Sequence, residues 1–336
     1  MKLLVTGGLG YLGSHTVVEL TNNGHEVVIL DNLFNSSKKV LDKINKILGK
    51  QITFFEGDIL DKALLKQIIK NHKIKGVFHF AGLKSVKESI KNKKKYYDVN
   101  VGGTKNLVES MQENIDGFKY VIFSSSACVY GAPNYLPYDE NHSLSPKNYY
   151  GETKLFTENF LKTAFENNAG WKIICLRYFN PIGAHESHLI GDDPKYNSEN
   201  IMPIITDVAS SKKKKLKIFG FDYSTLDGTP VRDFIHVSDL MEGHLAAFNF
   251  LKKSKNQLFD VFNLGTGHGI SVLELIKTFE KVNGIKIPYE FSQRRPGDLQ
   301  EYYADIGKAS EILNWTASRS LSDMCFSSWK FQELLK

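Results

Sequence analysis

Tyr150 and Lys154 stand four positions apart, in a stretch that reads as a helix opening after Pro146. Residues at this spacing lie about one turn apart on the same helical face. A free phenol titrates near pH ~10, and an ammonium within ~4–6 Å lowers that pKa. The pair therefore predicts a general base for a hydroxyl proton. The same spacing is also typical of a solvated helix face without chemistry, so the rest of the chain must decide between the two interpretations.

A glycine-rich turn near the start supplies a second candidate site. Residues 8–13, Gly-Leu-Gly-Tyr-Leu-Gly, follow a short apolar run and open a helical pattern, which is the context that a G-x-G-x-x-G motif requires. Free N–H groups at such a helix start favour a pyrophosphate. Asp31 ends the next apolar run, about 20 residues on, where an acid binds ribose hydroxyls and repels a 2′-phosphate. The pattern predicts bound NAD rather than NADP; the alternative is a glycine turn without a ligand.

Two later strand ends carry residues that suit the same cofactor. Asp58 closes a third apolar run and can reach an adenine amino group, or it can cap the helix that follows. Gly82 closes a fourth apolar run. A residue without a side chain there either lets a dinucleotide lie close to the backbone or serves only the packing of the chain. Both interpretations stay open for each residue.

The elements that must position these residues alternate in type through the first half of the chain. Strands are expected at residues 3–6, 27–30, 52–55, 77–80, 120–124 and 172–176, and helices at 12–22, 63–71 and 101–114. Continuously apolar strands that alternate with helices predict an α/β fold, a Rossmann-type doubly wound parallel sheet. Its ligands bind at the carboxyl ends of the strands.

The regular alternation of strands and helices ends at about residue 180. A smaller mixed α/β substrate-binding domain is expected after it. Helices are expected at residues 201–210, 237–250, 271–282 and 306–313. We assign residues 1–180 to the NAD-binding Rossmann domain, with return segments from about 230–270. Residues 181–336 form mainly the second domain, although residues 260–264 can return as a strand of the large sheet.

Composition narrows the class of protein. The net charge of +6 over 336 residues rests largely on lysine runs at 91–95 and 212–215, which lack interleaved aromatics, so no nucleic-acid partner is expected. No apolar run approaches the ~20 residues of a membrane helix, and the apolar start is too short for a signal peptide. A cytoplasmic protein is expected. Three scattered cysteines predict neither a disulfide framework nor a metal site.

The chain resembles the extended short-chain dehydrogenase/reductase family. The resemblance rests on residues 6–13, on Ser124-Ser125-Ser126-Ala127 and on Tyr150-x-x-x-Lys154. Within the family it is similar to the enzymes that epimerise UDP-hexoses at C4. The motifs that carry this similarity are spread in order over nearly the whole chain: Leu-Asp-Asn-Leu at 30–33, His-Phe-Ala-Gly-Leu-Lys at 79–84, residues 124–131, Leu-Arg-Tyr-Phe-Asn-Pro at 176–181, residues 227–237 and residues 294–299.

The resemblance implies a reaction and a role for each residue of the site. Tyr150 would take the proton of the sugar 4-hydroxyl, Lys154 would bind the nicotinamide ribose and lower the pKa of the tyrosine, and Ser126 would hydrogen-bond the same oxygen. UDP-galactose and UDP-glucose would interconvert through transient oxidation at C4, with NAD tightly bound, in galactose metabolism. A homodimer is expected, paired through helices around residues 101–114 and 149–167, although the apolar faces of these helices are equally consistent with packing inside one chain.

The binding residues implied by the resemblance form two sets. The cofactor set is Gly7, Gly10, Tyr11, Leu12, Gly13, Asp31, Asn32, Asn35, Ser36, Asp58, Ile59, Phe80, Ala81, Gly82, Lys84, Asn100, Tyr150, Lys154 and Phe179. The substrate set is Lys84, Ser126, Tyr150, Asn180, Asn200, Arg232, Arg295, Asp298 and Tyr302. For the two arginines, surface ion pairs are the alternative interpretation. The bulk of Tyr302 implies that N-acetylated sugars are excluded.

Two departures from the family pattern and three alternative functions accompany this interpretation. Cys128 stands where the family usually has Thr or Ser, and a thiol is the weaker donor. Val99 stands where some members carry an NAD-binding Asn, with Asn100 beside it. An epimerase that also accepts UDP-N-acetylhexosamines is one alternative. A nucleotide-sugar 4,6-dehydratase is another, but Ala127 and Cys128 offer no carboxyl for the elimination. A non-catalytic NAD-sensing regulator would be expected to have lost Tyr150 or Lys154.

Overall fold

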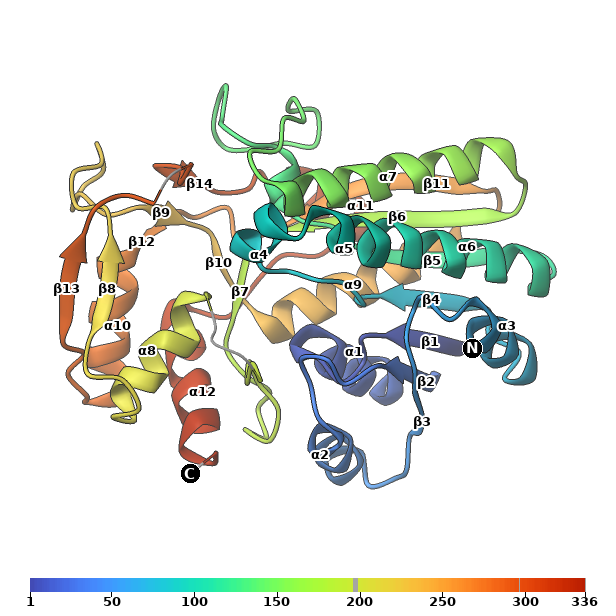
Figure 1. The fold of residues 1–336 in the computed structure, drawn as a ribbon, viewed down its shortest axis with the longest axis horizontal. Coiled ribbons are helices and arrows are strands. Elements are labelled where there is room, and N and C mark those ends of the chain that lie inside the picture. Colours follow the sequence, from blue (N-terminus) through green and yellow to red (C-terminus); the bar gives the residue numbers. More distant parts are fainter. Residues whose placement is uncertain (196–198, 296, 336) are drawn as a thin grey trace.

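The computed structural model describes residues 1–195, 199–295 and 297–335. Its centre is a parallel sheet of seven strands in the order β11-β6-β5-β4-β1-β2-β3 (Figure 1). The strands are β1 Lys2–Thr6, β2 Glu26–Asp31, β3 Thr53–Glu56, β4 Gly76–His79, β5 Lys119–Ser124, β6 Trp171–Tyr178 and β11 Leu258–Leu264. The strand order reverses between β1 and β4, and such a switch point opens a crevice at the carboxyl ends of the strands.

Helices cover both faces of this sheet (Figure 1). One face carries α1 Tyr11–Asn22, α2 Lys38–Leu48, α9 Val237–Lys253 and α11 Gly307–Leu313. The other face carries α3 Lys62–Asn71, α6 Gly103–Asn114 and α7 Tyr149–Asn167. Because both faces are buried, every residue of β6 is buried, and the strands could be read from the sequence as continuous apolar runs.

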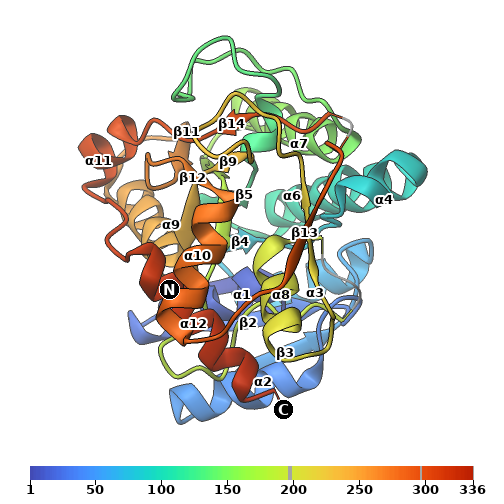
Figure 2. The ribbon, with the colours of Figure 1, turned by 90° about the vertical axis from the view of Figure 1, so that its left-hand side faces the viewer.

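The second part of the structure lies beside the carboxyl ends of the sheet (Figures 1 and 2). Its helices are α8 Ile201–Ala209, α10 Val272–Asn283 and α12 Leu321–Glu333. Its short strands are β7 Asn180–Ile182, β8 Leu216–Phe219, β9 Val231–Arg232, β10 Phe234–His236, β12 Ile270–Ser271, β13 Tyr289–Ser292 and β14 Glu301–Tyr302. They enclose a separate core that includes Ile205, Leu275 and Phe279.

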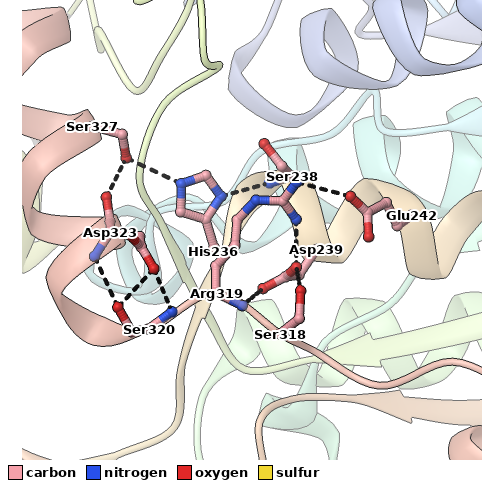
Figure 3. Close-up of polar contacts among 9 residues, drawn as sticks. All are labelled: His236, Ser238, Asp239, Glu242, Ser318, Arg319, Ser320, Asp323 and Ser327. Carbon is pink, nitrogen blue, oxygen red and sulfur yellow. Dashed lines mark hydrogen bonds and ion pairs between the residues drawn. The ribbon is translucent and has the colours of Figure 1, made fainter.

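The junction of β10 and α9 ties the two parts together (Figure 3). The Nδ1 atom of His236 accepts a hydrogen bond of 3.0 Å from the backbone N–H of Ser238 in α9. Its Nε2 atom lies 3.1 Å from the hydroxyl of Ser327 in α12. Arg319, just before α12, forms an ion pair with the fully buried carboxylate of Asp239 in α9. The last helix is therefore anchored to the segment that brings Arg232 toward the sheet.

The expected elements agree with the structure where the pattern was strong. All six expected strands are present, and residues 258–264 form the seventh. The expected helix at 101–114 begins within a π-helical segment, Asp98–Gly102, and continues as α6. Four helices were missed: α2, α4 Val86–Lys91, α5 Lys93–Tyr97 and α12. No helix in the described ranges combines the length and the apolar character that a bilayer span requires.

Candidate active site

The loop between β1 and α1 admits only glycine at two points. Gly7 has a φ of +69°, and a Cβ added to it would lie 2.8 Å from the amide nitrogen of Ala81. A Cβ on Gly13 would lie 2.1 Å from the carbonyl oxygen of Gly7. Gly10 is the N-cap of α1, and no described side chain caps that helix start. The tight loop and its uncapped N–H groups fit the pyrophosphate of a dinucleotide.

The carboxylate of Asp31 is held in a fixed position at the end of β2. It accepts hydrogen bonds from the N–H of Leu9 at 3.0 Å, from the N–H of Leu33 at 2.9 Å and from the hydroxyl of Ser36 at 2.8 Å. A carboxylate has about four acceptor sites, so capacity remains for a ribose hydroxyl. The hydroxyl of Ser36 therefore orients the carboxylate of Asp31. Asn35 lies half-buried in the same loop.

Asn32 and Asp58 follow β2 and β3 and adjoin each other, where the sequence predicts a contact with adenine. The side-chain amide of Asn32 donates to the carboxylate of Asp58 at 2.8 Å. Asp61, not Asp58, is the N-cap of α3, so the capping interpretation of Asp58 is wrong. Ile59 is buried in the core, and a Cβ on Gly103 would lie 2.5 Å from it. Its side chain therefore supports the loop by packing.

Asn100 points inward and holds the loop after β4. Its Oδ1 accepts from the N–H of Leu83 at 2.7 Å, and its Nδ2 donates to the carbonyl of Leu83 at 3.1 Å. The same Nδ2 donates to the hydroxyl of Thr153 in α7 at 3.0 Å. The loop that contains Gly82 and Lys84 is thereby fixed to the helix that carries Tyr150. Phe80 and Ala81 begin this loop at the switch point.

The remaining residues of the cofactor set flank this crevice. The hydroxyl of Tyr11 donates to the carbonyl of Gly183 at 2.7 Å, and Leu12 packs on the core beneath α1. Lys84 is exposed, and its ammonium lies 3.8 Å from the carboxylate of Asp192. Asp192 has a side-chain exposure of only 12% and was missed in the sequence because no motif marks it.

Tyr150, Lys154 and Ser126 meet at the end of β5. Asn148 caps α7 by accepting from the N–H of Gly151 at 2.8 Å. The Lys154 ammonium donates to the carbonyl oxygen of Ser124 at 2.6 Å and lies 5.8 Å from the ring centre of Tyr150. Ser126 begins a short 3-10 turn, Ala127–Val129, immediately after that strand. Helix α7 and strand β5 therefore bring the three predicted catalytic side chains together.

The pKa values at this site differ from the expectation. Burial raises the pKa of Tyr150 above its ordinary value, the charge of Cys128 adds to the increase, and a hydrogen bond with Ser126 opposes it. Burial also lowers the pKa of Lys154 to about 8. The net pKa of Tyr150 is therefore raised, where a lowered value was expected, because loss of water around the phenol is the largest influence on it. The Lys154 ammonium is bonded to the carbonyl of Ser124.

Cys128 and Tyr178 also belong to this site. Burial raises the pKa of the Cys128 thiol, and hydrogen bonds with Ser126 and Tyr302 lower it, so the thiol lies between these two side chains. The hydroxyl of Tyr178 donates a short hydrogen bond to the Ser124 hydroxyl. Tyr178 could have been suspected from its place between Arg177 and Phe179 in a family motif.

Tyr302 forms an aromatic wall on the substrate side. It is 9% exposed, and its ring centre lies 4.8 Å from that of Phe179 and 5.5 Å from that of Tyr138. Tyr138 is fully buried and donates to the carbonyl of Gly131 at 2.7 Å. The wall is rigid because each ring packs on a buried neighbour.

The predicted polar residues of the substrate set differ in the partners that the structure gives them. Arg232 and Asp298 form an ion pair of 2.5 Å, so they adjoin each other. The Arg295 guanidinium lies 4.1 Å from the centre of the Phe219 ring. The Oδ1 of Asn180 is buried and has no hydrogen-bond partner among the described residues. The amide of Asn200 donates to Asp192 at 3.1 Å.

The arrangement as a whole offers a dinucleotide crevice, a phenol with a neighbouring ammonium and serine, and polar side chains beyond them. The unpartnered oxygen of Asn180 leaves an acceptor for a polar ligand, because such buried atoms are ordinarily paired. Within the described ranges, no group of three or more His, Cys, Asp or Glu residues is placed to hold a metal ion.

Comparisons with known proteins support this interpretation. A model of the NAD dependent epimerase/dehydratase family matches residues 3–265. The UDP-glucose 4-epimerase of Bacillus subtilis (strain 168) is 48% identical over 332 residues, which cover 99% of this chain and 97% of that protein. The UDP-glucose 4-epimerase of Mus musculus is 46% identical over 340 residues, covering 99% and 96%.

Solved structures agree with the fold over its whole length. The UDP-glucose-4-epimerase of Stenotrophomonas maltophila, with bound NAD and formylated UDP-arabinopyranose, has a TM-score of 0.96 at 42% identity and covers 100% of this chain and 98% of its own. The Bifidobacterium longum enzyme, in complex with NAD+ and UDP, has a TM-score of 0.94 at 43% identity, with coverage of 99% and 98%. The fold expected from the sequence and its family resemblance are confirmed, and the chain belongs to the NAD dependent epimerase/dehydratase family.

Proposed function

We propose that the chain is a UDP-glucose 4-epimerase that interconverts UDP-galactose and UDP-glucose. The observation that carries the proposal is the 48% identity over 99% of the chain to proteins of that activity, in a chain that keeps Tyr150, Lys154 and Ser126 together at the end of β5. When bound, NAD supplies a reversible oxidation at C4 of the sugar, so the complete cycle involves no net oxidation.

The residues of this chain remove one proton from the sugar during that cycle and return it. Tyr150 removes the proton of the 4-hydroxyl and returns it, and Ser126 holds the same oxygen and relays the proton. Lys154 binds the ribose next to the nicotinamide. The raised pKa of Tyr150 means that proton removal depends on positive charge near the phenol, and the ammonium of Lys154 and a cationic nicotinamide provide it.

The substrate side suits a UDP-sugar. Arg232 and Arg295 would contact the diphosphate, where a planar guanidinium matches two phosphate oxygens. Asp298 would bind the uridine ribose, with Asn180 and Asn200 near the sugar and phosphates. Lys84 and Phe179 complete the contacts, and Phe179 packs on Tyr302 at 4.8 Å between ring centres.

Two related activities are less well supported. A 4,6-dehydratase needs an acid and a base besides the tyrosine, and the turn after Ser126 offers only Ala127 and Cys128. One structural neighbour, from Campylobacter jejuni, is described as a UDP-Glc/GlcNAc 4-epimerase. The packed ring of Tyr302 argues against the larger N-acetylated sugar for this chain.

The proposal includes a homodimer and a cytoplasmic location. Phe156 in α7 is 42% exposed and Tyr97 in α5 is 46% exposed. The centres of their rings lie 6.2 Å apart on the outer surface. Such an exposed aromatic pair suits a helix-bundle interface with a second copy. Light scattering is expected to give twice the chain mass, whereas a single chain mass would exclude the dimer.

The ligand that co-purifies with the protein tests the proposal as a whole. Denaturing the purified protein is expected to release NAD together with a UDP-sugar, identified by mass spectrometry. Release of NADP, or of a sugar nucleotide with another base, would contradict the assigned activity.

A further inference from the structure

Glu158 continues the row formed by Tyr150 and Lys154 along α7. The three residues are spaced by four, so they succeed one another at each turn of the same helical face. Glu158 is 4% exposed, and a carboxylate buried so deeply needs strong partners. The proton transfer at the sugar 4-hydroxyl makes no use of this group.

Arg177 in β6 supplies the first partner. Its Nε donates to one oxygen of Glu158 at 2.9 Å, and its Nη2 donates to the other oxygen at 2.6 Å. Arg177 is itself 3% exposed, and its Nη1 donates to the hydroxyl of Tyr130 at 3.2 Å. The Tyr130 hydroxyl in turn donates to Asn263 in β11 at 2.6 Å. The carboxylate is therefore fixed with respect to the sheet by two parallel hydrogen bonds.

Ser125 supplies the second partner and connects the ion pair to the site. Its hydroxyl donates a short hydrogen bond to the Glu158 carboxylate. Ser125 immediately precedes Ser126, and Lys154 holds the carbonyl of Ser124 at 2.6 Å. Two successive turns of α7 thus hold Ser124, the last residue of β5, and Ser125, which follows it, and this fixes where the Ser126 hydroxyl lies relative to Tyr150.

The charge of Glu158 also acts on Lys154. Burial lowers the pKa of Lys154 to about 8, and the negative charge of Glu158 is the largest influence that raises it. Other titratable groups near the ammonium are Tyr150, whose pKa burial raises, Cys128 after β5, Cys175 in β6 and His79 in β4. Burial raises the pKa of both thiols and lowers that of His79 to about 3, so these groups stay neutral near pH 7. Glu158 is therefore the neighbouring charge that favours the ammonium.

A purely structural role does not account well for this ion pair. Replacing buried ion pairs by apolar residues of similar volume is often neutral or stabilising, so burial of the pair is weak evidence for a role in stability. We propose that Glu158 is a positioning residue for the epimerase reaction. It orients Ser126 through Ser125 and places a negative charge one helical turn from the Lys154 ammonium. This inference rests on the proposed function, since it assigns Ser126 and Lys154 their roles in that reaction.

Two variants separate the two parts of the proposal. Ser125→Ala removes the link to Ser126 and leaves the Glu158–Arg177 ion pair in place. We expect its kcat to fall about tenfold, the size of effect expected for a lost hydrogen bond to a charged group, with KM nearly unchanged and the pH profile unmoved. Glu158→Gln removes the charge as well. Its kcat is expected to fall further, and the alkaline limb of its pH profile is expected to move to lower pH, because Lys154 then loses its proton more easily.

Glu166→Gln, an exposed carboxylate two turns further along α7, is the matched control and should behave as the unmodified protein. Circular dichroism establishes that each variant is folded. If Glu158→Gln does not fold, Ser125→Ala still tests the positioning of Ser126. The inference is overturned if Ser125→Ala keeps the normal kcat, or if folded Glu158→Gln keeps both the kcat and the pH profile.

A readout without turnover keeps this test separate from the proposed function. The titration of Lys154 can be followed by NMR in protein with 13C-labelled lysine, with the signal assigned by its loss in Lys154→Met. The midpoint is expected to move to lower pH in Glu158→Gln and to stay in place in Ser125→Ala. An unmoved midpoint in Glu158→Gln contradicts the inference even if the protein proves inactive on UDP-sugars, whereas that inactivity alone contradicts only the proposed function.

Discussion

The ammonium of Lys154 donates a hydrogen bond to the carbonyl oxygen of Ser124 at 2.6 Å. This bond joins the helix that carries the proposed base to the strand that leads to Ser126. It also places the ammonium in a buried environment, where its pKa falls to about 8. The charge that the reaction requires is therefore lost as the pH rises through about 8.

The pH dependence of turnover follows from this lowered pKa. Below about pH 8 Lys154 is charged, and above it the ammonium deprotonates, so kcat is expected to fall as the pH rises through about 8. Lys154→Arg stays charged in this range, so its residual activity should lack that alkaline limb. Initial rates in overlapping buffers measure both profiles. A kcat that stays level well above this pH would show that the charge of Lys154 is not required.

Removal of the Tyr150 hydroxyl should abolish chemistry but not cofactor binding. We expect Tyr150→Phe to lose about 10²- to 10⁴-fold in kcat, the usual contribution of a general acid–base group, and to retain bound NAD. Tyr149→Phe is the matched control, because it removes the hydroxyl of the adjacent tyrosine. The ring of Tyr149 contacts a different lysine: its centre lies 5.2 Å from the Lys93 ammonium on helix α5. An active Tyr150→Phe variant would remove Tyr150 from its proposed role.

The sequence was most informative where one physical cause dominates the pattern. Strands such as β6 are covered on both faces, so their apolar runs could be read directly. The glycine loop was equally readable, because the close approach of Gly13 to Gly7 admits no side chain. In contrast, α5 was missed because its Lys93–Tyr97 segment is mostly exposed lysine and lacks an apolar stripe.

Properties that depend on tertiary contacts could not be read from the sequence. The pKa of Tyr150 depends on how deeply its hydroxyl is buried, which spacing to Lys154 does not reveal. The ion pair of Arg232 with Asp298 joins residues far apart in the chain, so the sequence around either residue does not reveal its partner. Asp192 was missed because it approaches Lys84 only through folding.

The wall formed by Tyr302 should determine which sugars are accepted. Tyr302→Cys removes a ring packed 4.8 Å from that of Phe179, and room for an N-acetyl group should result. We expect kcat/KM for UDP-N-acetylglucosamine to rise at least about tenfold, within the range that a single pocket contact provides. Tyr303→Cys is the adjacent control and should show no gain. Efficient epimerisation of that substrate by the unmodified protein would refute the pocket argument.

The thiol of Cys128 should limit the rate, because it lies between Ser126 and Tyr302 and is a weaker hydrogen-bond donor than a hydroxyl. Cys128→Thr restores a stronger donor, and a hydrogen bond contributes about 0.5–1.5 kcal/mol. We therefore expect kcat/KM for UDP-galactose to rise about two- to tenfold, with Cys128→Ala as the control that should show no rise. A lower value for Cys128→Thr would mean that the site is adapted to the thiol.

Interconversion of the two UDP-hexoses by the unmodified protein tests the central claim most directly. The purified protein, incubated with UDP-galactose and without added reductant or NAD, is expected to form UDP-glucose until the two sugars reach a constant ratio. The same ratio should be reached from UDP-glucose, because an isomerase catalyses both directions. Protein that carries bound NAD and yet leaves both UDP-sugars unchanged would contradict the account.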